Sequence, residues 1–285
     1  MTEPTDHHLE SLIRLLDDDD ADVVSTITDH IVGLGPDIVQ PLRDIVRTTS
    51  DVVVRGRIEG IIRQFQQGAL DDLHRLMLIH RDSGTDIDLE SALYLLNGFG
   101  RPGDDRETVS DYLDSLALRV HEHFIATTPA NDLTQLLAMN SVLFEEEQFQ
   151  GAVDRYYDPQ NSYLTSTIER RRGIPVTLCV LALLLADRSG LTLYPIALPY
   201  HFILYCPDID VYVDPFHHGT FLSRTDCISF VERSGLTFTD DMLEPVRNLD
   251  IVIRMMRNLA FAHSKVNESW ESHVLQQVLL DVAPQ

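Results

Sequence analysis

Residues 169–186, ERRRGIPVTLCVLALLLA, decide the fold that we predict for this chain. A basic triplet and a glycine lead into a continuous apolar run over residues 174–186, which holds Cys179. The run is shorter than the roughly 20 residues that span a bilayer. We therefore expect a core segment of a globular domain and not a membrane anchor.

After this run the pattern changes to short strands. Three segments are rich in β-branched and aromatic side chains and are predicted as strands, residues 194–198, 202–205 and 211–213. Turn residues at 207–210 predict a hairpin between the last two strands. Helical patterns return at residues 226–232, 251–266 and 270–280.

Before the run, the sequence has helical patterns almost throughout. A loose repeat relates Leu15 to Ile45 with an offset of 30 residues, and Asp22 to Asp51 with an offset of 29. Such a period is typical of stacked helical hairpins, so we predict two HEAT-like hairpins in this region. Further helical segments are expected at residues 73–79, 92–96, 109–124 and 132–144.

The composition excludes several classes of protein. With 285 residues and 44% hydrophobic content, the chain can form one or two domains with a packed core. Its net charge of −23 argues against nucleic acid or an anionic membrane surface as a partner. Residues 1–8 lack the features of a secretory signal, and the three cysteines form no CxxC pair. We expect a cytoplasmic protein.

Three residues are candidates for a catalytic site. Cys179 on a helix, His201 on a strand and Asp214 on the next strand follow the chain order of papain-like cysteine chemistry. The alternative is structural: a buried cysteine acts as a small hydrophobic residue, and a His–Asp pair holds two strands in register. His217 offers a further imidazole, but we predict no metal site and no cofactor.

Five motifs together resemble the SirB family, which is classed as transglutaminase-like. They occur in the family's order at residues 156–164, 169–178, 198–202, 213–216 and 253–259. The resemblance covers roughly residues 86–265. It implies an α+β fold in which a transglutaminase-like, papain-like core packs a central helix on a small antiparallel sheet. The family has no established biochemical activity.

The resemblance also implies roles for individual residues. It aligns Gly173-Ile174-Pro175 with the Gly-x-Cys that opens the catalytic helix, so Pro175 occupies the nucleophile position. Cys179 lies four residues later, only about 40° away in helical phase but roughly 6 Å further along the axis. His201 and Asp214 match the general base and its orienting carboxylate.

Other residues are candidates for binding. Arg172 belongs to a triplet of arginines that can bind an anionic ligand or pair with Asp158. Asn161 and Tyr163 follow a turn and are predicted to close one side of the His201 region, as capping residues or as a polar wall. Tyr200 and His217 stand where the family usually has other residues, and both flank the expected pocket.

These observations lead to one architecture and two functions. We predict HEAT-like hairpins over residues 1–85, a SirB-type transglutaminase-like domain over 86–245, and a helical tail over 246–285 that resembles part of a tetratricopeptide repeat. The favoured function is an interaction or regulatory module without transglutaminase activity, with a protein or peptide partner. The alternative is a cysteine hydrolase or acyltransferase that uses Cys179, His201 and Asp214.

Overall fold

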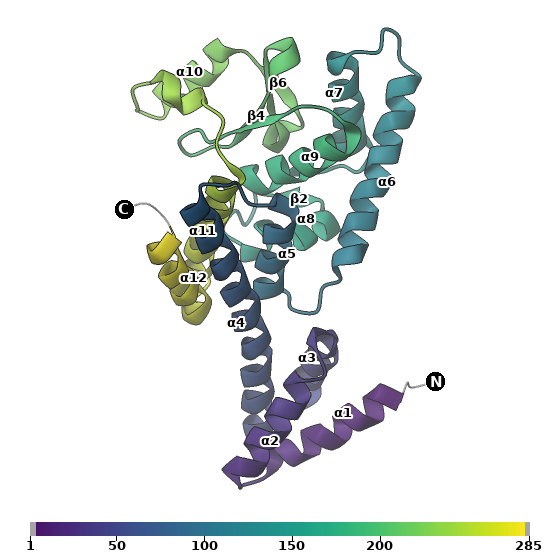
Figure 1. Cartoon of the computed structure of the whole chain (residues 1–285), viewed down its shortest axis with the longest axis vertical. Coiled ribbons are helices and arrows are strands. Elements are labelled where there is room, and N and C mark those ends of the chain that lie inside the picture. Colours follow the sequence, from purple (N-terminus) through teal and green to yellow (C-terminus); the bar gives the residue numbers. More distant parts are fainter. Residues whose placement is uncertain (1–3, 283–285) are drawn as a thin grey trace. The chain divides into compact units, whose positions relative to one another are not determined.

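The computed structural model describes residues 4–282 and is mostly helical, with one small antiparallel sheet (Figure 1). Its contacts divide the chain into two compact units. The first unit comprises residues 1–75 and 94–105, and the second comprises residues 76–93 and 106–285. The α+β fold with a helical N-terminal region is therefore confirmed, whereas the boundaries at residues 85 and 245 stay predictions.

Amphipathic helices build the first unit. They are α1 (Pro4–Arg14), α2 (Ala21–Val32), α3 (Val39–Thr48) and the first part of α4 (Val52–Ser83). Leu16, Ile31, Leu42 and Ile58 are fully buried in their shared core. The separate helical segment predicted at residues 73–79 is part of α4, a continuous helix of 32 residues. Its interior glycines at 56, 60 and 68 have open space around them and do not interrupt it.

Helix α9 (Pro175–Ser189) is the centre of the second unit. Residues 175–182 of this helix are all buried, which explains why the sequence shows an apolar run without helical periodicity. Proline at the first helical position begins the helix, and Gly190 in the left-handed conformation (φ 71°) ends it.

The antiparallel sheet has four strands in the order β3-β4-β5-β6. They are β3 (Tyr194–Ile196), β4 (Ile203–Cys206), β5 (Val211–Asp214) and β6 (Thr220–Leu222). Leu204 pairs with Val213, and the neighbouring Tyr205 pairs with Tyr212. The sequence predicted the first three strands but not β6.

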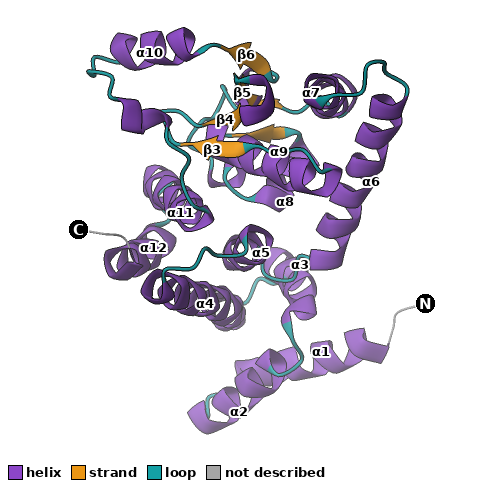
Figure 2. Cartoon of the chain, turned by 45° about the horizontal axis from the view of Figure 1, so that its top comes forward, coloured by secondary structure: helices purple, strands orange, loops and turns teal. Residues whose placement is uncertain are grey.

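Each face of the sheet is covered by a helix (Figure 2). Ile203 and Tyr212 pack with residues of α10 (Arg224–Arg233) in one apolar cluster. Because side chains alternate along a strand, the buried Leu204 and Val213 face the opposite side, where α9 lies. The sheet is thus fixed between two helices.

Further helices complete the second unit. They are α5 (Leu89–Gly100) in its first turn, α6 (Arg106–Ile125), α7 (Asp132–Asn140), α8 (Leu164–Arg170), α11 (Asn248–Lys265) and α12 (Ser269–Val282). A short parallel pair, β1 (Gln150–Gly151) with β2 (Arg172–Gly173), precedes α9. Within residues 4–282, no helix is both long and apolar enough to cross a membrane.

The tight contact of Gly151 with Phe216 generates a prediction about stability. A Cβ atom at residue 151 would lie 2.6 Å from the Phe216 ring. Gly151→Ala should therefore lower the free energy of unfolding by about 1–3 kcal/mol, as overpacking does.

The matched control is Gly68→Ala on α4, where a Cβ meets nothing within 4 Å. Because alanine favours helix over glycine, this variant should be unchanged or more stable by about 1 kcal/mol or less. Urea unfolding measures both changes. Equal effects of the two substitutions would contradict the packing described for Phe216.

Candidate active site

His201 and Asp214 form a buried pair at one end of the sheet. His201 lies just before β4 and Asp214 ends β5, and His201 Nε2 is 2.7 Å from Asp214 Oδ2. Their exposed fractions are only 6% and 4%. The left-handed conformation of Tyr200 (φ 61°) forms the turn before β4, in which the His201 amide donates to the Leu198 carbonyl at 3.2 Å.

The Asp214 carboxylate is held from four directions. Its Oδ1 accepts hydrogen bonds from the backbone N–H groups of Phe216 and His217, at 3.0 and 3.3 Å. Its Oδ2 lies 2.7 Å from both His201 Nε2 and His217 Nδ1. Burial alone raises the pKa of Asp214, but the hydrogen bonds and charges of the two imidazoles outweigh it and lower the pKa below its usual value. The carboxylate is therefore ionised at neutral pH and can orient His201.

Pro175 occupies the place where the resemblance aligns the nucleophile. It is the first residue of α9 and lines the same pocket as His201. Its side chain is saturated hydrocarbon, and its nitrogen is a tertiary amide, so Pro175 offers neither a nucleophile nor a hydrogen-bond donor. At this position the chain cannot attack a substrate.

Cys179 lies one helical turn further along α9. Its side chain is fully buried, and its thiol donates to the carbonyl of Phe202 at 3.3 Å. Burial raises the pKa of the Cys179 thiol well above its ordinary value, and the negative charge of Asp214 raises it further. The sulfur is thus close to the backbone beside His201, but it is protonated and hidden from solvent.

Asn161 and Tyr163 are buried and make structural hydrogen bonds. The Asn161 amide donates to the Arg155 carbonyl at 2.9 Å, and its backbone carbonyl accepts from Ile174, just before α9. The Tyr163 hydroxyl lies 3.0 Å from His263 Nε2 on α11. The Asn161 carbonyl thus positions the start of α9, and Tyr163 connects the start of α8 to α11.

Two of the three arginines before α9 form ion pairs, with different carboxylates. Arg170 pairs with Asp158 at 3.0 Å, Arg171 pairs with Glu147 at 2.6 Å, and Arg172 is exposed. Within residues 4–282, the Arg172 side chain has no hydrogen-bond or ion-pair partner. The predicted ion pair with Asp158 is therefore formed by Arg170 and not by Arg172.

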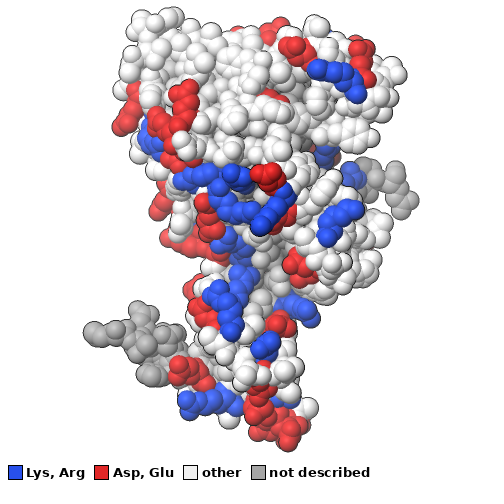
Figure 3. Space-filling view, turned by 180° about the vertical axis from the view of Figure 1, so that it is seen from behind, with Lys and Arg blue, Asp and Glu red and all other residues white. Residues whose placement is uncertain are grey.

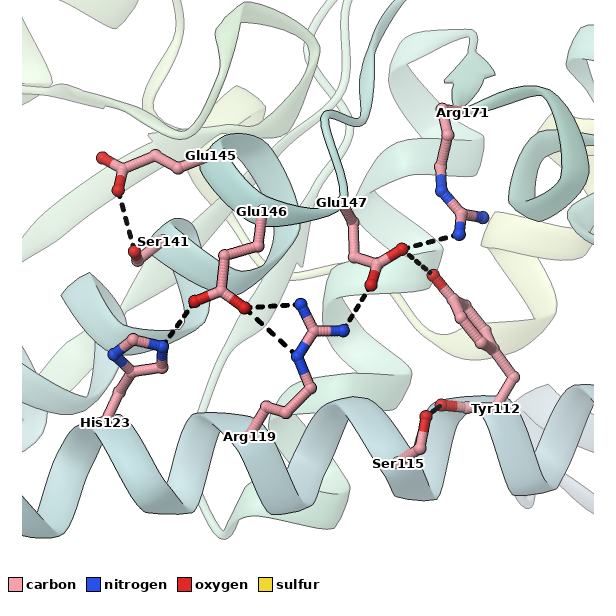
Figure 4. A network of polar contacts seen from close by, with 9 residues as sticks. All are labelled: Tyr112, Ser115, Arg119, His123, Ser141, Glu145, Glu146, Glu147 and Arg171. Atoms are coloured by element: carbon pink, nitrogen blue, oxygen red, sulfur yellow. Dashed lines mark hydrogen bonds and ion pairs between the residues drawn. The ribbon is translucent and has the colours of Figure 1, made fainter.

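Arg171 belongs to a charged network that connects α6 to the strand before α9 (Figure 4). Glu147 accepts hydrogen bonds from Arg119 and from the Tyr112 hydroxyl, both on α6, while it pairs with Arg171. The Arg171 guanidinium also lies over the Phe149 ring, 4.9 Å from its centroid. The network holds the turn between α8 and β2, from which α9 starts.

A pocket of about 570 Å³ lies in front of His201 and Pro175. Tyr200, 75% exposed, stands at this pocket, and α11 contributes Arg254, Arg257 and Phe261. None of these α11 residues was among the predicted binding residues, although Arg254 and Arg257 belong to the motif at residues 253–259. Their spacing of three and four was the available signal, because it places all of them on one helical face.

His201, Asp214 and His217 also meet a geometric condition for a metal site. One ligand atom from each lies within 4.8 Å of the others. All three atoms are already joined by hydrogen bonds around Asp214 Oδ2, so the cluster is satisfied without an ion. The absence of a metal stays a prediction.

The lowered pKa of Asp214 predicts how stability depends on pH. The unfolded chain binds a proton to this carboxyl at a higher pH than the folded chain does, so its contribution is present above about pH 4 and is lost as the pH falls through the folded pKa. Asp214→Asn should lower the free energy of unfolding by about 1–3 kcal/mol near neutral pH, and less in acid.

Urea unfolding over a series of pH values tests this expectation, with Asp208→Asn at an exposed carboxylate as the control. The control should differ little from the natural chain at any pH. A difference between Asp214→Asn and the natural chain that stays constant into strong acid would show that the carboxylate is not stabilised by its imidazole partners.

Comparisons with known proteins find relatives of this chain. The chain is 32% identical over 171 residues to a UPF0162 protein of Xylella fastidiosa strain 9a5c, a match that covers 57% of this chain and 58% of the relative. It is 30% identical over 155 residues to F-box only protein 21 of Pongo abelii, covering 51% of this chain and 24% of that protein. The matches therefore cover less than two thirds of the length of these relatives.

No solved structure gives a significant match. Residues 107–257, more than half of the chain, match the family model described as the transglutaminase-like superfamily. This range contains α9, the sheet, His201 and Asp214, and it ends at Arg257 in α11, so that Phe261 of the pocket lies beyond it. The chain therefore belongs to the transglutaminase-like superfamily.

Proposed function

We propose that this chain does not carry out cysteine-dependent acyl transfer and acts instead as an interaction or regulatory module. The observation that carries the proposal is the start of α9, where Pro175 faces the pocket beside His201 while Cys179 is buried one turn deeper. A protein or peptide partner and a cytoplasmic location belong to the same proposal.

The chemistry of the lost reaction explains why this placement matters. A cysteine nucleophile acts as a thiolate and needs access to the substrate carbonyl. In active sites the first turn of a helix and a neighbouring imidazolium lower the thiol pKa. Cys179 has the opposite environment, since burial raises its pKa and its thiol already donates to Phe202. His201 and Asp214 are left as an oriented base without a nucleophile.

The relatives support the proposal only at the level of the domain. A UPF0162 protein and an F-box only protein each match about half of this chain, and both are longer than the matched part. A segment shared by proteins of different length suits a binding module. The assignment to the SirB family rests on the five sequence motifs and is part of the proposal.

One observation favours the alternative, a cysteine hydrolase or acyltransferase. The His201–Asp214 pair keeps the 2.7 Å geometry that orients a general base, and the Cys179 sulfur contacts the residue next to His201. This enzyme would require α9 to open so that the sulfur reaches both the imidazole and solvent.

Thiol alkylation separates the two functions. In the folded chain at neutral pH, iodoacetamide should label Cys179 no faster than the buried Cys206 and Cys227, and unfolding in urea should expose all three. Mass spectrometry of the digested protein measures each rate. Fast labelling of Cys179 that is slowed by His201→Ala would support the enzyme instead.

The variant Pro175→Cys provides a positive control in the same assay. A thiol at this position would lie in the first turn of α9 and in the pocket of His201, so it should be alkylated faster than Cys179. Adding His201→Ala should slow that labelling. If the new thiol were as unreactive as Cys179, the assignment of residue 175 to the nucleophile position would be wrong.

A further inference from the structure

The pocket in front of His201 is basic in an acidic chain. Arg254 and Arg257 of α11 line it, and none of the fourteen residues that line it is an aspartate or a glutamate. Acidic residues outnumber lysine and arginine by 45 to 22 in the whole chain. On the face shown in Figure 3, basic side chains mostly lie beside acidic ones. The arginines of the pocket differ from this arrangement.

Arg254 is half-buried and has no carboxylate partner within the described residues. Its Nη2 donates to the backbone carbonyls of Leu198 and His201, both at 3.4 Å, which are long contacts. Burial lowers the pKa of Arg254. The nearby Tyr156 raises this pKa, and the positive charge of Arg257 lowers it further. The guanidinium stays charged at neutral pH because arginine titrates far above it. Its remaining donors are available to a ligand.

Arg257 follows one helical turn later and is exposed. In the part of the chain that the structure describes, its side chain makes no hydrogen bond or ion pair. Like charges three residues apart on a helix repel each other. The chain therefore keeps two uncompensated positive charges on the same face of α11, next to His201.

Aromatic rings form the adjacent wall of the pocket. Tyr157 contacts Tyr156 and Phe261, with ring centroids 5.4 and 5.3 Å apart. All three rings are more than a third exposed, at 39%, 50% and 49% for Tyr156, Tyr157 and Phe261. Exposed aromatic side chains beside arginine are the residues enriched where proteins bind their partners.

We infer that this pocket binds a ligand that carries an oxyanion, a carboxylate or a phosphate, next to a flat apolar group. Arg254 and Arg257 would receive the oxyanion, since guanidinium groups bind both anions through paired hydrogen bonds. The rings of Tyr157 and Phe261 would contact the apolar part. The volume of about 570 Å³ suits a small molecule or the end of a peptide.

The inference rests on the proposed binding function, because His201 and Pro175 line the same pocket. It adds the class of ligand. From the sequence, an anionic ligand was expected at Arg172 and not at α11. Arg172 does not line this pocket and provides a matched control, since it is an exposed arginine without a side-chain partner in residues 4–282.

Calorimetric titration of the full chain with benzoate, phenyl phosphate and the neutral benzamide tests the inference. We expect benzoate or phenyl phosphate to bind and benzamide to bind at least about tenfold more weakly, the loss expected for one charge-assisted hydrogen bond. Tighter binding of phenyl phosphate would identify a phosphate ligand, and tighter binding of benzoate a carboxylate. Equal binding of all three probes, or no binding, would overturn the inference.

Two variants in the pocket, at Arg257 and Arg254, and a control variant at Arg172 locate the site. Arg257→Gln should weaken the anionic probe by about tenfold, whereas Arg172→Gln should leave its affinity unchanged. Arg254→Lys keeps the charge but loses the paired donors, so it should weaken the probe as well. Equal losses in Arg257→Gln and Arg172→Gln would mean that the probe senses only overall charge, and the inference would fail.

Alkylation of Cys179 in the same samples shows which of the two proposals is wrong, the ligand class or the function without a reactive cysteine. A chain that binds no anionic probe and has an unreactive Cys179 contradicts the ligand class alone. A chain with a reactive Cys179 contradicts the proposed function, while the affinities of the probes still decide the ligand class.

Discussion

The first turn of α9 determines which side chains of this helix reach the pocket and which lie in the core. It places Pro175 in the pocket and turns Cys179 into the core, where the thiol donates to the Phe202 carbonyl. The turn is positioned by several groups that are far apart in sequence, including the Asn161 carbonyl, which accepts from Ile174, and the network around Glu147 that holds Arg171. Moving the helix by one turn would break these contacts together. The position of the sulfur is thus a property of the fold and not of one side chain.

The buried carboxylate of Asp214 is the second fixed point. Two backbone N–H groups and two imidazoles surround it, so its negative charge is stabilised despite burial. The same charge raises the pKa of the Cys179 thiol. In an active cysteine enzyme an imidazolium next to the sulfur would compensate such an effect. Here the arrangement orients His201 toward a pocket that is lined by Pro175 and by arginines of α11. The site therefore combines an oriented base with two positively charged side chains.

The sequence predicted the parts of this site that depend on local pattern. The apolar run indicated a buried core segment at residues 174–186, and the family resemblance implied that this segment is a helix. The alternation of residues 202–213 indicated the hairpin that brings His201 to Asp214. The strand β6 and the parallel pair β1–β2 escaped prediction because they have only two or three residues and depend on pairing across the chain. Arg254 and Arg257 were recognised as parts of a motif, but their place in the pocket follows from the tertiary packing of α11. No local pattern places residue 254 beside residue 201.

A titration of the thiols in the folded chain tests whether Cys179 stays protonated at neutral pH. The ultraviolet absorbance of the thiolate, followed against pH in the natural chain and in Cys179→Ser, isolates the contribution of Cys179. The two titrations should coincide below the ordinary thiol pKa of about 8.5, because Cys179 stays protonated throughout that range. A thiolate signal near neutral pH that disappears in Cys179→Ser would show that Cys179 is ionised there. Such a thiolate would need an imidazolium beside it and would favour a cysteine enzyme.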